Sequence, residues 1–122
     1  MKELEIIVSN ERLKDVDNVL REHKVGGMHY YIVTGWGITM KPKEEQVAGY
    51  GGYRTGREII PEFTSRTKVH VIIPDEMEEQ LINKLVNALS TGSAGDGKIF
   101  VKGITKVVDI GSKKVGEEAL WV

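Results

Sequence analysis

Thr91-Gly92-Ser93-Ala94-Gly95-Asp96-Gly97-Lys98-Ile99-Phe100-Val101 is the stretch that decides the fold of this chain. It follows a helical pattern and ends in an apolar run, so it predicts a helix-to-strand connection. Its glycines lack a Cβ, which permits a sharp turn and a close approach to a ligand. Backbone N–H groups in such a turn can form an anion-binding nest, and Lys98 adds a cation at its exit. An ordinary glycine-stopped connection is the other interpretation, whereas Ile99 after Lys98 excludes the Walker phosphate-binding motif.

The elements around this stretch are expected in the order βαββαβ. Strands are expected at 4–8, 28–34, 67–73 and 98–101, helices at 11–23 and 75–89, and a short fifth strand at 105–110. Asp75 and Glu78 resemble a capping box at the start of the second helix. This order predicts an α+β, ferredoxin-like sandwich.

Two helices can cover only one face of the predicted four-stranded sheet. The other face needs a cover, and the candidates for it are Tyr30, Ile32, Val69 and Val71. Self-association is the simplest remedy, and packing around a threefold axis is one closed way to achieve it.

The segment from Ile38 to about Arg66 has no hydrophobic periodicity. It carries Pro42, Pro61 and four glycines, Gly49, Gly51, Gly52 and Gly56. Structureless loops of this length are uncommon inside compact domains and are usually functional or disordered. We expect it to dock a partner through Tyr50, Tyr53, Arg54, Arg57 and Phe63; the alternative is a solvated excursion without a partner.

The composition excludes several classes of protein. A chain of 122 residues predicts a single domain over 1–122, and a net charge of −1 argues against a nucleic-acid partner. The absence of cysteine excludes disulfides, thiolate metal sites and cysteine nucleophiles. No apolar run approaches the roughly 18 residues that a membrane span needs. The amino-terminal residues lack the apolar core of a signal peptide, so a cytoplasmic location is expected.

Candidate catalytic and metal-binding residues are scattered. His23, His29 and His70 fall on different predicted elements without a paired spacing, so no metal site is predicted. The carboxylate pairs lie in polar stretches, and adjacent residues do not converge on one reacting atom. We therefore expect a protein that is not an enzyme, with no catalytic residues.

Three motifs, in this order and spacing, resemble the PII signal-transduction family over nearly the whole chain. They are Gly35-Trp36-Gly37, Thr91-Gly92 followed by 95–101, and Gly116-Glu117-Glu118-Ala119. The resemblance implies a homotrimer with nucleotide sites in the clefts between subunits. It identifies 38–66 with the long T-loop, which docks a target protein, 91–98 with the phosphate-holding B-loop, and the tail 111–122 with the C-loop.

The same resemblance implies the ligand and its contacts. Adenine would lie near Gly35, Trp36, Gly37 and the backbone around Ile72, and phosphates against Gly95, Asp96, Gly97 and Lys98. The implied function is a regulator that binds ADP, AMP or ATP and controls a transporter or an enzyme, in nitrogen regulation or a related pathway. A membrane transporter as target would not require this chain itself to enter the membrane.

The sequence departs from the family at the triphosphate site. The family's glutamine after the Gly-x-Gly turn is replaced by Thr39, and two arginines of the last strand by Asp109 and Gly111. Lys113 and Lys114 compensate only partly, because lysine lacks the planar fork of arginine. The family's modifiable tyrosine corresponds to Ile59. We expect ADP or AMP to bind at least as well as ATP, and responses to 2-oxoglutarate and magnesium to be reduced or lost.

Other readings stay open at this point. The departures also fit a PII-like sensor linked to inorganic carbon, which would bind ADP, AMP or bicarbonate. A small ferredoxin-like enzyme that uses the cleft as an active site is a second alternative. A purely structural trimer without a ligand is a third.

Overall fold

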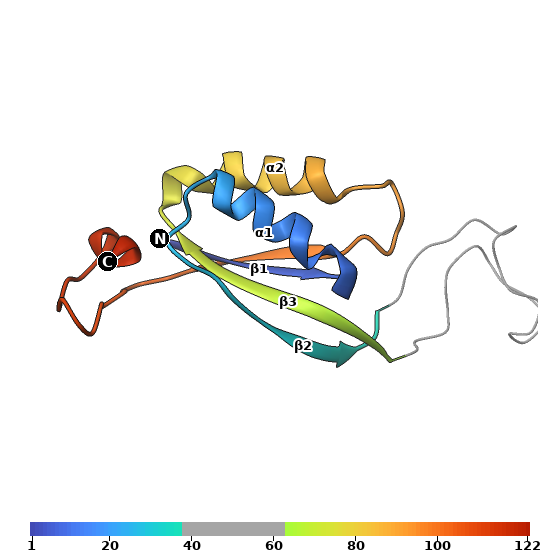
Figure 1. Cartoon of the computed structure of the whole chain (residues 1–122), viewed down its shortest axis with the longest axis horizontal. Coiled ribbons are helices and arrows are strands. Elements are labelled where there is room, and N and C mark those ends of the chain that lie inside the picture. Colours follow the sequence, from blue (N-terminus) through green and yellow to red (C-terminus); the bar gives the residue numbers. More distant parts are fainter. Residues whose placement is uncertain (38–62) are drawn as a thin grey trace, which may run out of the picture.

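The computed structural model describes residues 1–37 and 63–122 (Figure 1). The strands are β1 (Lys2–Val8), β2 (His29–Gly35), β3 (Thr64–Ile73) and β4 (Lys98–Gly103). The helices are α1 (Leu13–Glu22) and α2 (Glu78–Leu89), with short 3-10 turns η1 (Asn10–Arg12), η3 (Asp75–Met77) and η4 (Glu117–Trp121). This order confirms the predicted βαββαβ arrangement. Most of the predicted long loop, including Thr39 and Ile59, lies outside the described residues.

The four strands form one antiparallel sheet in the order β2-β3-β1-β4. Figure 1 shows α1 and α2 side by side over one face of it. The prediction of an α+β, ferredoxin-like sandwich is therefore confirmed. Within the described residues, no helix has the length and apolar character that crossing a bilayer requires.

The core fills the space between the helices and the sheet. Alternate residues of β1 and β3 meet the apolar faces of both helices there; the buried cluster comprises Leu4, Ile6, Val8, Val16, Val19, Leu20, Val69, Val71, Ile73, Leu81, Leu85 and Leu89. Successive strand residues point to opposite faces, so this packing fixes which residues remain on the helix-free face.

The assignment of Val69 and Val71 to the helix-free face was wrong, because both are buried beneath the helices. Tyr30 lies opposite Val69 and Ile32 opposite Thr67, so these two belong to the helix side as well. The run from Val69 to Ile73 is apolar except for His70, which leaves the alternation of this strand ambiguous in sequence.

Two boundaries differ from the prediction. Thr64, Ser65 and Arg66 were expected in the long loop but start β3, where they pair with Gly35, Thr34 and Val33. Polar residues give no periodic signal, yet their backbones complete the ladder. The expected fifth strand at 105–110 was wrong, because it is reduced to one isolated bridge between Val108 and Val115.

The expected capping box does not form. Asp75 instead pairs with the amino terminus, with 3.0 Å between Oδ1 and the nitrogen of Met1, and Glu78 pairs with the Lys2 ammonium at 3.5 Å. Neither the turn η3 nor α2 has a side-chain cap. The two cations at the start of β1 pair with these carboxylates instead.

Candidate functional site

All the predicted nucleotide residues except Ile72 gather at one end of the sheet. Gly35 ends β2 opposite Thr64, and Trp36 and Gly37 continue from it. The glycine loop, residues 91–97, connects α2 to β4 at this same end (Figure 1). Gly95, Asp96, Gly97 and Lys98 therefore share the end of the sheet at which 38–62 departs.

The glycine loop is closed by a contact between Thr91 and Asp96. The carboxylate of Asp96 accepts hydrogen bonds from the backbone N–H and the hydroxyl of Thr91, both at 2.6 Å. These bonds, the hydroxyl's first, hold the pKa of Asp96 below its ordinary value. Asp96 thus serves as the acceptor that closes the loop.

Several amides of the loop already have partners within it. The N–H of Gly95 donates to the Ser93 hydroxyl at 3.3 Å, and the N–H of Asp96 to the Ser93 carbonyl at 3.3 Å. The side chain of Lys98 is exposed, and in the described ranges it forms no ion pair. The ammonium of Lys98, directly after the loop, is therefore the group most available to bind an anion here.

Gly97 is the glycine that this loop needs most. Its φ is +129°, and a Cβ there would stand 2.1 Å from the carbonyl oxygen of Ile7. Both facts exclude a side chain, since only glycine adopts this conformation readily and only glycine fits against β1.

One predicted adenine contact lies far from the others within the chain. Ile72 lies on β3, where it pairs with Glu3 of β1. On the same strand, Thr64 pairs with Gly35, and Ile72 is eight residues further along. At about 3.3 Å per residue, this separation is about 26 Å. A single chain does not bring Ile72 to Gly35, so a site that uses both requires two copies.

Asp109 and Gly111, which the sequence comparison with the family expects in place of two arginines, lie in an exposed turn. The Asp109 carboxylate accepts the N–H of Ser112 at 2.8 Å, which lowers the pKa of Asp109. The backbone of Asp109 also bonds to Lys113 and Lys114, and Lys113 has a φ of 65°. Both lysine side chains are exposed. Asp109 shapes this turn, which β4 separates from the glycine loop in the chain.

An ionic cluster on the helix-free face was not predicted. His70 is buried there, with Nδ1 3.0 Å from Glu3 Oε2 and Nε2 3.3 Å from the Tyr31 hydroxyl. The ring of His29 stacks on that of His70, with 4.9 Å between the centroids. The alternation of Lys68, Val69 and His70 was the available signal, but it names no partner strand.

Glu5 lies at the centre of this cluster, and its side chain is almost fully buried. Lys68 Nζ lies 3.0 Å from one carboxylate oxygen, and Lys102 Nζ contacts the other. The Lys102 contact, followed by that of Lys68, lowers the pKa of Glu5 to about 2, while Glu5 raises the pKa of Lys102. Glu3, Glu5 and His70 are close enough to hold a metal ion. Two ammonium groups already occupy Glu5, however, so the arrangement is an ion-pair network.

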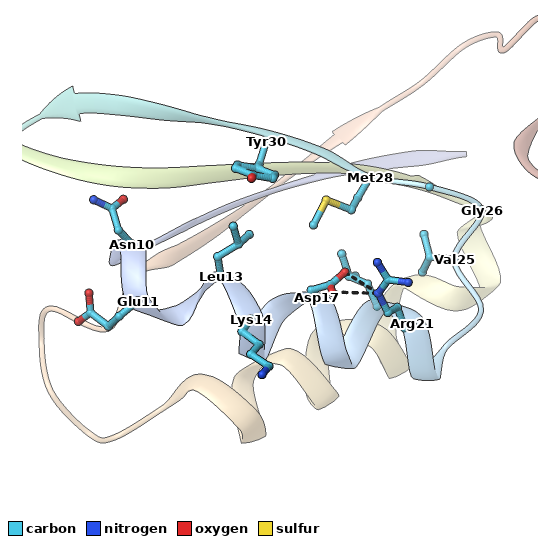
Figure 2. A pocket seen from close by; sticks show the side chains of 12 residues that line it. Asn10, Glu11, Leu13, Lys14, Asp17, Arg21, Val25, Gly26, Met28 and Tyr30 are labelled. Carbon is cyan, nitrogen blue, oxygen red and sulfur yellow. Dashed lines mark hydrogen bonds and ion pairs between the residues drawn. The ribbon is translucent and has the colours of Figure 1, made fainter.

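A groove of about 740 Å³ separates α1 from β2 (Figure 2). Its polar wall includes Lys14, Asp17 and Arg21, and the ion pair between the last two spans one helical turn at 2.9 Å. Met28 and Tyr30 line the strand side. None of the predicted nucleotide contacts lines this groove.

Comparison with known proteins gives a consistent result. The family model described as nitrogen regulatory protein P-II matches residues 1–114. Nitrogen regulatory protein P-II of Rhodobacter capsulatus is 31% identical over 120 residues, covering 98% of this chain and 100% of that protein. Nitrogen regulatory protein P-II 2 of Methanothermobacter thermautotrophicus is 32% identical over 120 residues, covering 98% and 97%.

Solved structures show the same fold. The structure of B. subtilis GlnK is similar with a TM-score of 0.75 and 26% identity, covering 98% of this chain and 97% of that one. The B. subtilis GlnK-ATP complex has a TM-score of 0.74 at 24% identity and covers 98% and 96%.

Proposed function

The chain belongs to the nitrogen regulatory protein P-II family, and from this membership we propose that it binds an adenine nucleotide between subunits and controls a target protein through the segment 38–66. Members of this family are regulatory signal-transduction proteins and not enzymes, so the enzyme alternative is set aside. The observation that carries the proposal is the closed glycine loop, whose exposed Lys98 shares one end of the sheet with Gly35–Gly37. The proposed location is the cytoplasm.

The proposed site is shared by two copies of the chain. Phosphates lie against Gly95, Asp96, Gly97 and Lys98 of one copy. Adenine lies near Gly35, Trp36 and Gly37, together with the backbone around Ile72. Since Ile72 and Gly35 are far apart within one chain, the two copies supply them separately, in the homotrimer expected from the family.

The proposed ligand is ADP or AMP at least as much as ATP. The loop offers Lys98 as its exposed cation, while Asp109 brings a carboxylate where the family has an arginine. Fewer cations favour ligands with fewer phosphates, because the charge of each added phosphate must be balanced. The responses to 2-oxoglutarate and magnesium are proposed to be reduced or lost.

Isothermal titration of the full chain with ATP, ADP and AMP tests the proposal. Each nucleotide is titrated alone, with magnesium and 2-oxoglutarate, and with bicarbonate. Preference for ADP or AMP without an effect of 2-oxoglutarate supports it. Tight ATP binding with 2-oxoglutarate synergy contradicts the proposed ligand preference, and a response to bicarbonate favours the inorganic-carbon alternative.

Lys98→Ala supplies the matched test of the site. Removal of the exposed ammonium is expected to weaken ADP binding at least tenfold, because a charge-assisted contact to phosphate is lost. Lys84→Ala, on the exposed side of α2, is the control and should bind as the unmodified chain does. Equal affinities of all three proteins would contradict the assignment of Lys98. Absence of nucleotide binding by the unmodified chain would favour the structural-trimer alternative.

A further inference from the structure

Arg66 joins the start of β3 to the glycine loop. It lies opposite Val33 on the helix-free face of the sheet, and its side chain is half-buried. Its Nη1 atom donates a hydrogen bond to the carbonyl oxygen of Gly95 at 3.1 Å. Its Nη2 atom lies 3.9 Å from the position that a Cβ on Gly95 would occupy. The guanidinium therefore rests against the backbone of the loop.

This contact fixes one particular peptide group. The carbonyl of Gly95 and the N–H of Asp96 belong to the same planar peptide, so they turn together. Arg66 holds the carbonyl, and the carbonyl of Ser93 accepts the N–H at 3.3 Å. The Gly95–Asp96 peptide is thus clamped on both sides.

The orientation of this peptide matters for an anion. Asp96 turns its carboxylate towards Thr91, which leaves the exposed side of the loop to Lys98. A flipped Gly95–Asp96 peptide would turn the Gly95 carbonyl oxygen towards the phosphates in place of the Asp96 N–H. That oxygen would repel an anionic ligand.

The residues beside Arg66 are tied down as well. The Thr67 hydroxyl donates to Asn10 Oδ1 at 2.8 Å, and Asn10 Nδ2 donates to the Ser65 hydroxyl at 3.2 Å. Both neighbours of Arg66 are thereby linked to η1. The strand thus presents the guanidinium from a fixed backbone, and a fixed donor loses less entropy when it holds a loop.

We propose that Arg66 is the positioning residue of the glycine loop, which sets the Gly95–Asp96 peptide so that the loop accepts phosphate. The role of the loop as a phosphate site rests on the proposed function, but the clamp itself exists without a ligand. Arg66, at the start of β3, therefore determines the shape of the phosphate site in the glycine loop.

Hydrogen exchange on the nucleotide-free full chain tests the clamp directly. Arg66→Gln keeps a polar side chain but loses the fixed fork, and amides in 91–97 are expected to exchange about fivefold faster, which corresponds to about 1 kcal/mol. Arg66→Lys retains one cationic donor and should restore part of the protection. Arg21→Gln is the control, because Arg21 is exposed on α1 and pairs only with Asp17 among the described residues.

Titration with ADP and AMP then separates positioning from other roles. In Arg66→Gln the affinity for ADP is expected to fall more than that for AMP, with the thermal midpoint close to that of the Arg21→Gln control. A loss of ADP affinity without faster exchange in 91–97 would overturn the proposal and make Arg66 a direct ligand. Unchanged exchange and unchanged affinity would overturn it as well. Faster exchange in a chain that binds no nucleotide would uphold the clamp and reject the proposed function.

Discussion

At the scale of single residues, Glu5 shows how a charged side chain is kept on a crowded sheet face. Both of its oxygens contact ammonium groups, and its side chain is only 5% exposed. A buried carboxylate without partners would take up a proton, whereas a paired one stays charged. The low pKa of Glu5 is therefore a property of Lys68 and Lys102, which β3 and β4 bring to it.

We predict that Glu5 makes folding sensitive to acid. Its pKa is about 2 in the folded chain against an ordinary 4.5, so the unfolded chain binds the proton first. The stability that Glu5 contributes is present above pH 4.5 and is lost as the pH falls towards 2. Urea unfolding from pH 7 to pH 3, at constant protein concentration, should show a shallower decline for Glu5→Gln than for the unmodified chain.

Glu22→Gln is the control for that series. Glu22 is exposed at the end of α1, so its substitution should leave the pH dependence of the free energy of unfolding unchanged. Parallel curves for Glu5→Gln and Glu22→Gln would show that the pairing of Glu5 does not govern acid stability.

A second prediction concerns Gly95 and Gly97 of the glycine loop. Gly97→Ala places a Cβ 2.1 Å from the Ile7 carbonyl oxygen at a positive φ, so it should cost more than about 1–3 kcal/mol of the free energy of unfolding. Gly95→Ala meets only the Arg66 side chain, at 3.9 Å, and should be tolerated. Chemical denaturation of both variants measures the difference. Equal stabilities would mean that the backbone at Gly97 shifts more easily than its contact with β1 implies.

At the scale of elements, the C-terminal turn η4 is held by the connection between α1 and β2. The indole N–H of Trp121 donates to the Lys24 carbonyl at 2.9 Å. The backbone of Leu120 approaches Gly26 so closely that a Cβ there would stand 1.8 Å from its carbonyl oxygen. The tail therefore docks where a side chain is missing.

We predict that Gly26→Ala releases this turn. A Cβ at Gly26 cannot coexist with the Leu120 carbonyl, and that atom belongs to backbone, so η4 must move as a unit. Gly27→Ala is the neighbouring control, because nothing lies within 4 Å of its added Cβ. Hydrogen exchange over 117–122 should accelerate in the first variant only. Protection that persists in Gly26→Ala would show that the connection adjusts instead of the tail.

At the scale of the whole molecule, stability comes from one core between the helices and the sheet. Leu85 on α2 is fully buried in it, whereas its neighbour Val86 is 48% exposed. Leu85→Ala should lower the free energy of unfolding by about 2–5 kcal/mol, because a cavity replaces packed atoms. Val86→Ala should change it by no more than about 0.5 kcal/mol. Urea denaturation compares the two, and similar losses would mean that the exposed side of α2 is covered in solution.

The sequence was sufficient to predict the order of elements, the sandwich and the place of the glycine loop between α2 and β4. These rest on local signals: the apolar spacing of α1 and α2, the β-branched runs, and glycines at turns. Such signals depend on neighbours within a few residues, which the chain itself supplies. The family resemblance depended on the same short motifs.

Only the tertiary structure decided which face each strand turns to the helices, and hence that Val69 and Val71 are buried while His70 meets Glu3. It also decided that Asp75 binds the amino terminus and that Arg66 reaches Gly95. Each of these contacts joins residues far apart in the chain, and several polar partners were available to each side chain. The register of β1, β3 and β4 determines which of these partners meet. A shift of one residue would move every side chain of a strand to the opposite face of the sheet.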